Sequence, residues 1–196
     1  MAVGILPLVL SDETLLIKAV AGERDSLDEL FHRYRSVAFR VAHRLLGNEA
    51  DALDAVQDGF VKVLVHLPSF QGRSSFKTWL LRVVSNAALD LGRQRGRRET
   101  LSMDSLGSTY REECEPFTHV EPTRELERQD LRRKVDEALA QLPAAQRQTF
   151  VLHAEAELSY REVAEVLGIS IGTVMSRLYY ARQRLRVLLE PWVTAQ

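Results

Sequence analysis

The residues best suited to bind another molecule lie near the end of the sequence, where hydroxyls and arginines recur through residues 170–186. Such groups on one helix face can donate hydrogen bonds to phosphate oxygens and base edges. Just before them, Ser159 is placed to start a short helix and Gly168 to end it, with the small Ala164 where two helices would cross. This pattern predicts a helix-turn-helix, whose second helix enters the major groove. A plain helical hairpin with a solvated basic face is the alternative.

A second basic segment, residues 70–98, has aromatic residues between its charges, and Asp90 is its only acid. Basic groups that follow a phosphate backbone, beside a loop that accepts an unstacked base, are what single-strand binding requires. Phe76 and Trp79 stand at helical spacing, however, and aromatics so spaced are more often part of a core. The arginines of residues 93–98 can equally form a solvated helix end. Both interpretations stay open.

Acidic residues mark a third segment, residues 51–63. Asp51, Asp54, Gln57 and Asp58 share one side of a predicted helix, because Asp54 follows Asp51 by three residues, and Gln57 and Asp58 follow Asp54 by three and four. No His or Cys accompanies them in this segment, so metal or acid–base chemistry is not indicated. The face is predicted either to be solvated or to dock a partner protein.

No pattern in the sequence is typical of a catalytic or metal site. Phosphate-cradling glycine loops and catalytic triads are missing, and the histidines are scattered without the spacing of metal ligands. Cys114 is the single cysteine, so neither an intrachain disulfide nor a cysteine-rich metal site can form. We therefore predict a protein without enzymatic activity, cofactor, metal or small-molecule substrate.

The elements that would position these residues are helices. Apolar residues recur at three- and four-residue steps, and Ser11, Ser74 or Ser75, Ser159 and Ser170 are placed as N-caps. In the helix over about residues 50–66 we expect the following side chains to face inward: Leu53, Val56, Phe60, Val63, Leu64 and Leu67. From residue 99 to about 122, serines, glycines and prolines replace this periodicity, and acidic residues outnumber basic ones.

The predicted fold is all-α, with two small helical domains joined by a flexible acidic linker, the second domain containing the helix-turn-helix. The expected boundaries are residues 1–98, 99–124 and 125–196. The 196 residues carry a net charge of −1, so contact with nucleic acid must come from local basic patches. The first ten residues are apolar but too short to span a bilayer, and no basic leader precedes them. We expect a cytoplasmic protein without membrane insertion.

Taken together, these segments resemble the extracytoplasmic-function sigma factors, the smallest class of the sigma-70 family. The similarity lies in DSLDELFHRY at residues 25–34, DALDAVQDGFVK at residues 51–62, the basic segment 70–98 and residues 142–188, in the family's order. The resemblance implies a non-catalytic transcription initiation factor that binds core RNA polymerase and directs it to particular promoters. It also implies an anti-sigma factor as partner, which the sequence itself does not reveal.

The resemblance further implies a role for individual residues. Those that would bind the clamp helices of the large polymerase subunit are Asp51, Asp54, Gln57 and Asp58. Those that would contact −10 promoter DNA and take its flipped base are Phe70, Gln71, Gly72, Arg73, Ser74, Ser75, Lys77, Asn86 and Arg93. Those that would read the −35 element are Ser170, Thr173, Met175, Ser176, Arg177, Tyr179, Tyr180 and Arg182. Trp79 would support the −10 loop from the core.

The sequence departs from the family's pattern at Met175 and Tyr180, where many relatives carry Lys, Arg or His facing the DNA. Arginine can pair bidentately with guanine, whereas methionine offers apolar contact and tyrosine a single hydroxyl. We therefore expect a −35 preference that leans on thymine methyls and phosphate contacts.

Two rival functions remain at this stage. A free-standing helix-turn-helix regulator, acting without being a polymerase subunit, would need a dimer interface and a palindromic site. No dimerisation helix is obvious in the sequence, and the first domain would then have no purpose. The other rival is an adaptor whose basic faces bind a protein. Titration into core polymerase would separate the three readings.

Overall fold

The computed structural model describes residues 10–102 and 122–193, and every regular element within them is helical. The elements of the first part are α1 (Asp12–Val20), α2 (Arg24–Leu46), α3 (Glu49–His66), the 3-10 turn η1 (Leu67–Ser69) and α4 (Phe76–Ser102). Those of the second part are α5 (Pro122–Ala140), α6 (Ala144–Ala154), α7 (Tyr160–Leu167) and α8 (Ile171–Val193). The predicted all-α fold is confirmed.

Four helices, α1, α4, α7 and α8, begin at serines that the sequence places as N-caps. Ser11 Oγ accepts a hydrogen bond from the amide of Thr14 at 3.3 Å, and Ser75 Oγ accepts one from the amide of Thr78 at 3.1 Å. These bonds satisfy amides that have no partner within the helix. The C-terminal end of α2 is at Gly47, which adopts the left-handed conformation with φ +78°. Local signals therefore fix these helix ends.

In α3 the predicted inward face is partly wrong. Leu53 and Leu64 are 54% and 48% exposed. The buried residues of α3 are Ala52, Ala55, Gly59 and Val63. The reason is a close approach between α3 and α4: a Cβ on Gly59 would lie 2.7 Å from Val84 Cγ2 and 3.2 Å from Val84 Cα. Small side chains have to face α4 there, so the larger leucines point outward.

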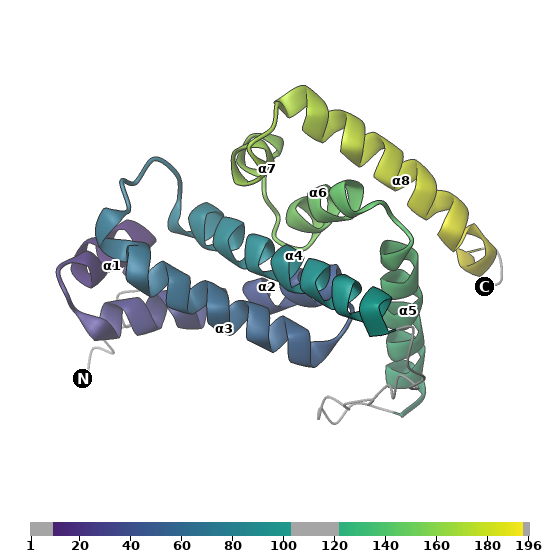
Figure 1. Cartoon of the computed structure of the whole chain (residues 1–196), viewed down its shortest axis with the longest axis horizontal. Coiled ribbons are helices and arrows are strands. Elements are labelled where there is room, and N and C mark those ends of the chain that lie inside the picture. The colour runs from purple at the N-terminus through teal and green to yellow at the C-terminus, as the bar shows by residue number, and fades with distance from the viewer. Residues whose placement is uncertain (1–9, 103–121, 194–196) are drawn as a thin grey trace, which may run out of the picture.

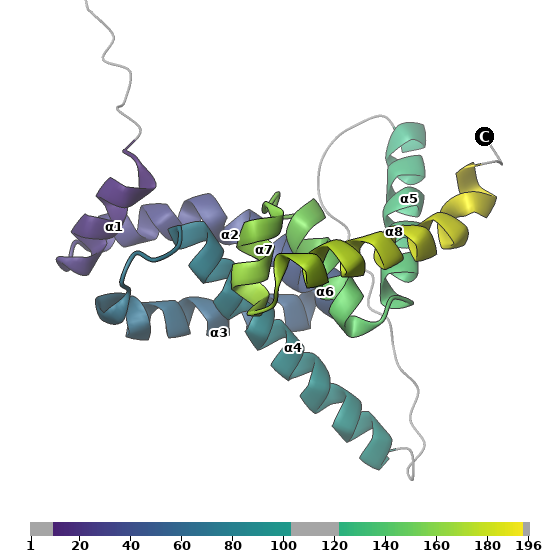
Figure 2. The same cartoon turned by 90° about the horizontal axis from the view of Figure 1, so that it is seen from above.

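Figure 1 shows α2, α3 and α4 side by side, with α6 and α7 beside them and α8 on the outside. Figure 2 shows from above that α7 and α6 lie over this group of three. The contacts agree, because α4 touches α7 and α2 touches both α5 and α6. The two helical parts are therefore packed against each other.

The two helical parts share one apolar core. One cluster of buried residues runs from Leu15 of α1 through Leu80 of α4 to Leu152 of α6 and Leu178 of α8. A second, smaller cluster lies between α5 and α8 and consists of Ala138, Leu139, Leu142, Ala181 and Leu185. The predicted linker, residues 99–124, overlaps the ends of α4 and α5, and residues 103–121 lie outside the described residues. The described part contains no helix long and apolar enough to cross a membrane.

Candidate nucleic-acid and protein interfaces

The predicted helix-turn-helix is formed by α7 and α8. Ser159 and Glu162 form a capping box: the Ser159 amide donates to Glu162 Oε2 at 2.8 Å, and Ser159 Oγ accepts from the Glu162 amide at 3.3 Å. Gly168 takes the left-handed conformation with φ +64° at the turn. Val163 and Val174 are fully buried between the helices. The angle between α7 and α8 is thus fixed by a cap, a glycine and apolar packing.

The outward face of α8 carries large side chains. Met175, Tyr179 and Tyr180 are 55%, 58% and 59% exposed. Arg182 is exposed as well, and Arg177 is half-buried. Two tyrosine rings, a thioether and guanidinium groups on one free helix face can contact bases and phosphates.

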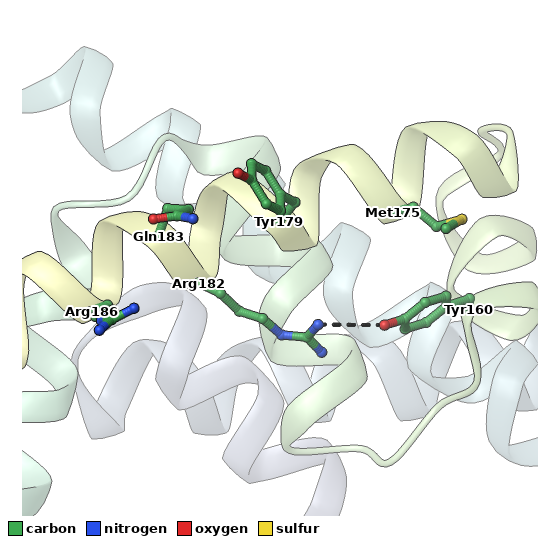
Figure 3. Close-up of a pocket in the computed structure, with 6 residues that line it drawn as sticks. All are labelled: Tyr160, Met175, Tyr179, Arg182, Gln183 and Arg186. Atoms are coloured by element: carbon green, nitrogen blue, oxygen red, sulfur yellow. Dashed lines mark hydrogen bonds between the residues drawn. The ribbon is translucent and has the colours of Figure 1, made fainter.

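A shallow hollow lies beside this face, between α7 and α8 (Figure 3). Its lining residues are Tyr160, Met175, Tyr179, Arg182, Gln183 and Arg186. Arg182 Nη1 lies 3.5 Å from Tyr160 Oη, toward which it points in Figure 3. The Tyr160 ring packs edge-on against His153, with ring centroids 5.0 Å apart. Neither Tyr160 nor Gln183 was among the site residues predicted from the sequence. For Tyr160 the reason is that it meets Arg182 only through the fold, across 22 positions.

The small hydroxyl residues of α8 already have partners inside the helix. Ser170 Oγ accepts from the Thr173 amide at 3.1 Å, which makes Ser170 the N-cap. Ser170 Oγ and Thr173 Oγ1 lie 2.8 Å apart, and Ser176 Oγ donates to the Thr173 carbonyl at 3.0 Å. These three residues stabilise the start of α8, whatever else they contact.

The loop from Phe70 to Ser75 lies between η1 and α4 and is held by a row of aromatic rings. The Phe70 and Trp79 ring centroids lie 4.6 Å apart, those of Trp79 and Phe76 6.1 Å, and those of Phe76 and Tyr34 5.9 Å. Phe76 is buried, while Phe70 and Trp79 are half-buried. Trp79 thus packs against the first residue of the loop.

The polar residues near this loop are mostly accessible. Those that are exposed are Gln71, Gly72, Arg73, Ser75, Asn86 and Arg93, and those that are half-buried are Ser74 and Lys77. Arg93 Nη2 donates to Asp90 at 2.5 Å, so the single acid of the segment is paired with one of its bases. Of residues 96–98 only the backbone is described.

The residues of the acidic face of α3 differ in exposure. Asp54, Gln57 and Asp58 are exposed. Asp51 is only partly exposed and accepts hydrogen bonds from Asn48 Nδ2 and Arg95 Nη1, both at 2.6 Å. Partial burial raises the pKa of the Asp51 carboxyl, but the bonds from Asn48 and Arg95 outweigh it and leave the pKa below its usual value.

The exposed acids of α3 stand next to exposed apolar side chains that the sequence had assigned to the core or left unassigned. These are Leu53, Val61, Leu64 and Val65. An acidic and apolar helix face that is left uncovered is typical of a protein-docking surface. Among the described residues no three His, Cys, Asp or Glu side chains are placed to hold a metal ion.

Comparisons with known proteins match this arrangement. Residues 30–98 match the model of Sigma-70 region 2, and residues 132–185 match that of Sigma-70, region 4. The chain is 35% identical over 161 residues, 82% of its length, to the ECF RNA polymerase sigma factor SigE of Mycolicibacterium smegmatis, and spans 60% of that relative.

Two solved structures are similar to the whole fold. One is that of CnrH in complex with the cytosolic domain of CnrY, with a TM-score of 0.70, 28% identity and coverage of 92% of this chain and 97% of that one. The other is the sigma factor RpoE in complex with the anti-sigma factor NepR from Bartonella quintana. It has a TM-score of 0.62, 27% identity and coverage of 83% and 97%.

Proposed function

The chain belongs to the sigma-70 family, in its extracytoplasmic-function class, and we propose that it is a dissociable subunit that brings RNA polymerase to particular promoters. The observation that carries the proposal is the presence in one chain of three uncovered faces: α3, the loop before α4, and α8. Catalysis belongs to the polymerase, and the chain acts in the compartment that holds it, the cytoplasm.

Core polymerase binds the uncovered face of α3 in this proposal. Asp54, Gln57 and Asp58 supply the polar contacts, and the exposed Leu53 and Val61 supply apolar area beside them. A centre of apolar contacts with a polar rim is the usual make-up of a protein interface. Asp51 acts indirectly, through its ion pair with Arg95.

The loop Phe70–Ser75 receives a base that leaves the stack of the −10 element. Trp79 and Phe76 hold the loop in place, Asn86 and the exposed Gln71 and Arg73 offer hydrogen bonds, and Lys77 and Arg93 supply charge toward phosphate. Contacts in such a site offset the cost of unstacking a base, a few kcal/mol.

The −35 element is read by α8. Met175, Tyr179 and Tyr180 form the large exposed part of its face, and Arg182 stands next to them. Because Ser170 is the N-cap, its hydroxyl binds the backbone of α8 before any DNA arrives. The larger side chains therefore determine most of the DNA sequence preference. Arg177 and Arg182 contact the phosphates.

A sigma factor of this class is expected to have an anti-sigma partner. The similar structure from Bartonella quintana is a complex of a sigma factor with such a protein. We include an anti-sigma factor among the proposed partners, beside core polymerase and promoter DNA.

Reconstituted transcription tests the proposal. With core polymerase and a randomised promoter library, the wild-type chain should select templates that share two elements. Asp54→Lys with Asp58→Lys should abolish the selection by removing polymerase binding, because both carboxylates are exposed on α3. Asp28→Lys, a charge change at an exposed acid of α2, is the control and should leave it intact. Tight binding of a duplex without polymerase, and no selection with it, would instead identify a free-standing regulator.

A further inference from the structure

The aromatic rings that pack against the loop before α4 form a row that ends at α1. The rings belong to Phe70, Trp79, Phe76 and Tyr34, and neighbouring centroids lie 4.6, 6.1 and 5.9 Å apart. Tyr34 of α2 is the last ring of the row, and its hydroxyl donates a hydrogen bond to Oδ2 of Asp12, the first residue of α1. The contacts therefore connect the first residue of the loop with a carboxylate of α1.

Asp12 is bound by two neighbouring residues of α2. Besides the bond from Tyr34, its Oδ1 accepts a hydrogen bond from Arg33 Nη1 at 2.9 Å, and Arg33 Nε donates to Glu29 Oε1 at 2.8 Å. The Asp12 and Arg33 side chains are 31% and 23% exposed, so water competes only partly for these bonds. Burial, together with the bond to Asp12, raises the pKa of Tyr34, so the hydroxyl stays protonated and remains a donor. The Tyr34 ring is therefore held at its hydroxyl end as well as by packing.

The loop before α4 and helix α1 lie at the same end of the molecule, as Figure 1 and Figure 2 show. At this end α1 touches both α2 and α4. Phe76, the first residue of α4, is only 3% exposed, so its ring cannot turn without moving the side chains around it. A shift of the Tyr34 ring would therefore be passed on to Trp79 and Phe70 through packed side chains.

We propose that Asp12 and Tyr34 are positioning residues for base capture: their hydrogen bond fixes the row of rings and thereby the shape in which the loop Phe70–Ser75 receives a base. The inference rests on the proposed function, because the loop captures a base only if the chain opens promoters. Neither residue touches DNA; both act through Phe76 and Trp79. Promoter opening then depends on α1, a helix that carries none of the proposed contacts with DNA or polymerase.

Glu23 offers a matched control for Asp12. It is also a carboxylate that joins α1 to α2, because its Oε1 accepts bonds from Lys18 Nζ at 3.2 Å and from Ser26 Oγ at 2.9 Å. Neither of these partners belongs to the row of rings. Asp12→Ala and Glu23→Ala therefore each remove two bonds between the first two helices, and only Asp12→Ala releases the hydroxyl of Tyr34.

Quenching of Trp79 fluorescence by acrylamide measures the positioning in the free chain. Trp192→Phe leaves Trp79 as the single tryptophan, since the sequence holds two. In this background Tyr34→Phe and Asp12→Ala should both make quenching steeper, because the rings against which Trp79 packs are held less firmly. Glu23→Ala should quench as the background protein does, and so should Asp12→Asn, which keeps an oxygen that accepts from Tyr34. Equal quenching in Asp12→Ala and Glu23→Ala would overturn the link between α1 and the row of rings.

Base capture is measured with the reconstituted holoenzyme. The probe is a single-stranded oligonucleotide that carries the −10 element found by promoter selection, with one base at a time replaced by an abasic site. For the unchanged chain, removal of the captured base should weaken binding about tenfold, as expected when one stacked base is lost. In Tyr34→Phe and Asp12→Ala this ratio should fall about threefold, an effect the size of one hydrogen bond. Glu23→Ala should keep the ratio, because a general loss of stability weakens binding of both oligonucleotides alike.

The outcomes separate this inference from the proposed function. If no abasic position weakens binding of the unchanged chain, the loop captures no base, and the proposed −10 role is overturned together with the inference. If the unchanged chain distinguishes the two oligonucleotides and Tyr34→Phe and Asp12→Ala distinguish them equally well, only the positioning role is overturned. Should Tyr34→Phe not fold, Asp12→Ala and Asp12→Asn give the same comparison with the tyrosine in place.

Discussion

Asp51 lies on the same helix as Asp54 and Asp58, but its carboxylate is bound inside the molecule. It accepts hydrogen bonds from Asn48, the N-cap of α3, and from Arg95 of α4. The sequence cannot distinguish the three acids. A spacing of three or four residues predicts that they share one side of a helix, but it does not predict which residues of other helices lie next to each of them. Asp51 therefore positions α3 against α4, beside the face that we propose to bind polymerase.

Replacing Asp51 by Asn should lower the free energy of unfolding by about 1 kcal/mol at pH 7, as expected for a charge-assisted bond of intermediate burial. Since the folded-state pKa of Asp51 is depressed, this contribution is present above the ordinary pKa of an aspartate and is lost as pH falls through the folded value. Urea unfolding of both proteins should therefore show a difference at pH 7 that shrinks below about pH 4. A difference that persists at acid pH would contradict the ion pair.

Met175 is the residue at which a change should alter promoter choice without altering the fold. Met175→Arg adds a fork that can pair with guanine, so promoters selected with the variant holoenzyme should gain a guanine within the −35 element. One bidentate pair corresponds to about 1–3 kcal/mol of discrimination. The exposed Val187→Arg, further along α8, is a control that adds the same charge. An unchanged selection profile for Met175→Arg would refute direct contact at this position.

At the scale of the elements, α3 packs closely against α4, and Gly59 makes this packing possible. A Cβ at this position would overlap Val84, including its backbone. Gly59→Ala should therefore destabilise the protein by about 1–3 kcal/mol, the range for overpacking in a core.

Gly92→Ala is the matched control, because its Cβ would meet only Leu46 Cδ2 at 3.4 Å. Alanine is the better helix former by about 1 kcal/mol, so this variant should be unchanged or more stable in thermal unfolding. If both variants lose stability equally, the close approach at Gly59 is not the cause.

The elements also show which features of the fold could be predicted from the sequence. Helix ends depend on neighbouring residues, so Ser11, Ser75, Ser159 and Gly168 predicted them correctly. The buried side of α3 depends on which helix lies opposite and how closely, so Leu53 and Leu64 were assigned to the wrong side. The contact of Tyr160 with Arg182 and the bonds from Arg44 to Asp136 and Glu155 join distant segments, so no local pattern contains them.

At the scale of the whole molecule, the sequence predicted two helical domains joined by a linker. It did not predict that the two domains pack against each other. Residues of α6 and α7 belong to the same buried cluster as those of α1 to α4. The interface combines this apolar packing with the ion pairs that Arg44 forms with Asp136 and Glu155.

The small cluster between α5 and α8 has a consequence for local motion. It contains five buried residues and is separate from the large core, so the amides of α5 and of the last turns of α8 should exchange with deuterium first. Those of α6 and α7 should be protected as long as those of α2 and α4. Slow exchange would thus extend from region 2 into region 4 and stop there, so that the unit that opens last contains most of both DNA-binding regions.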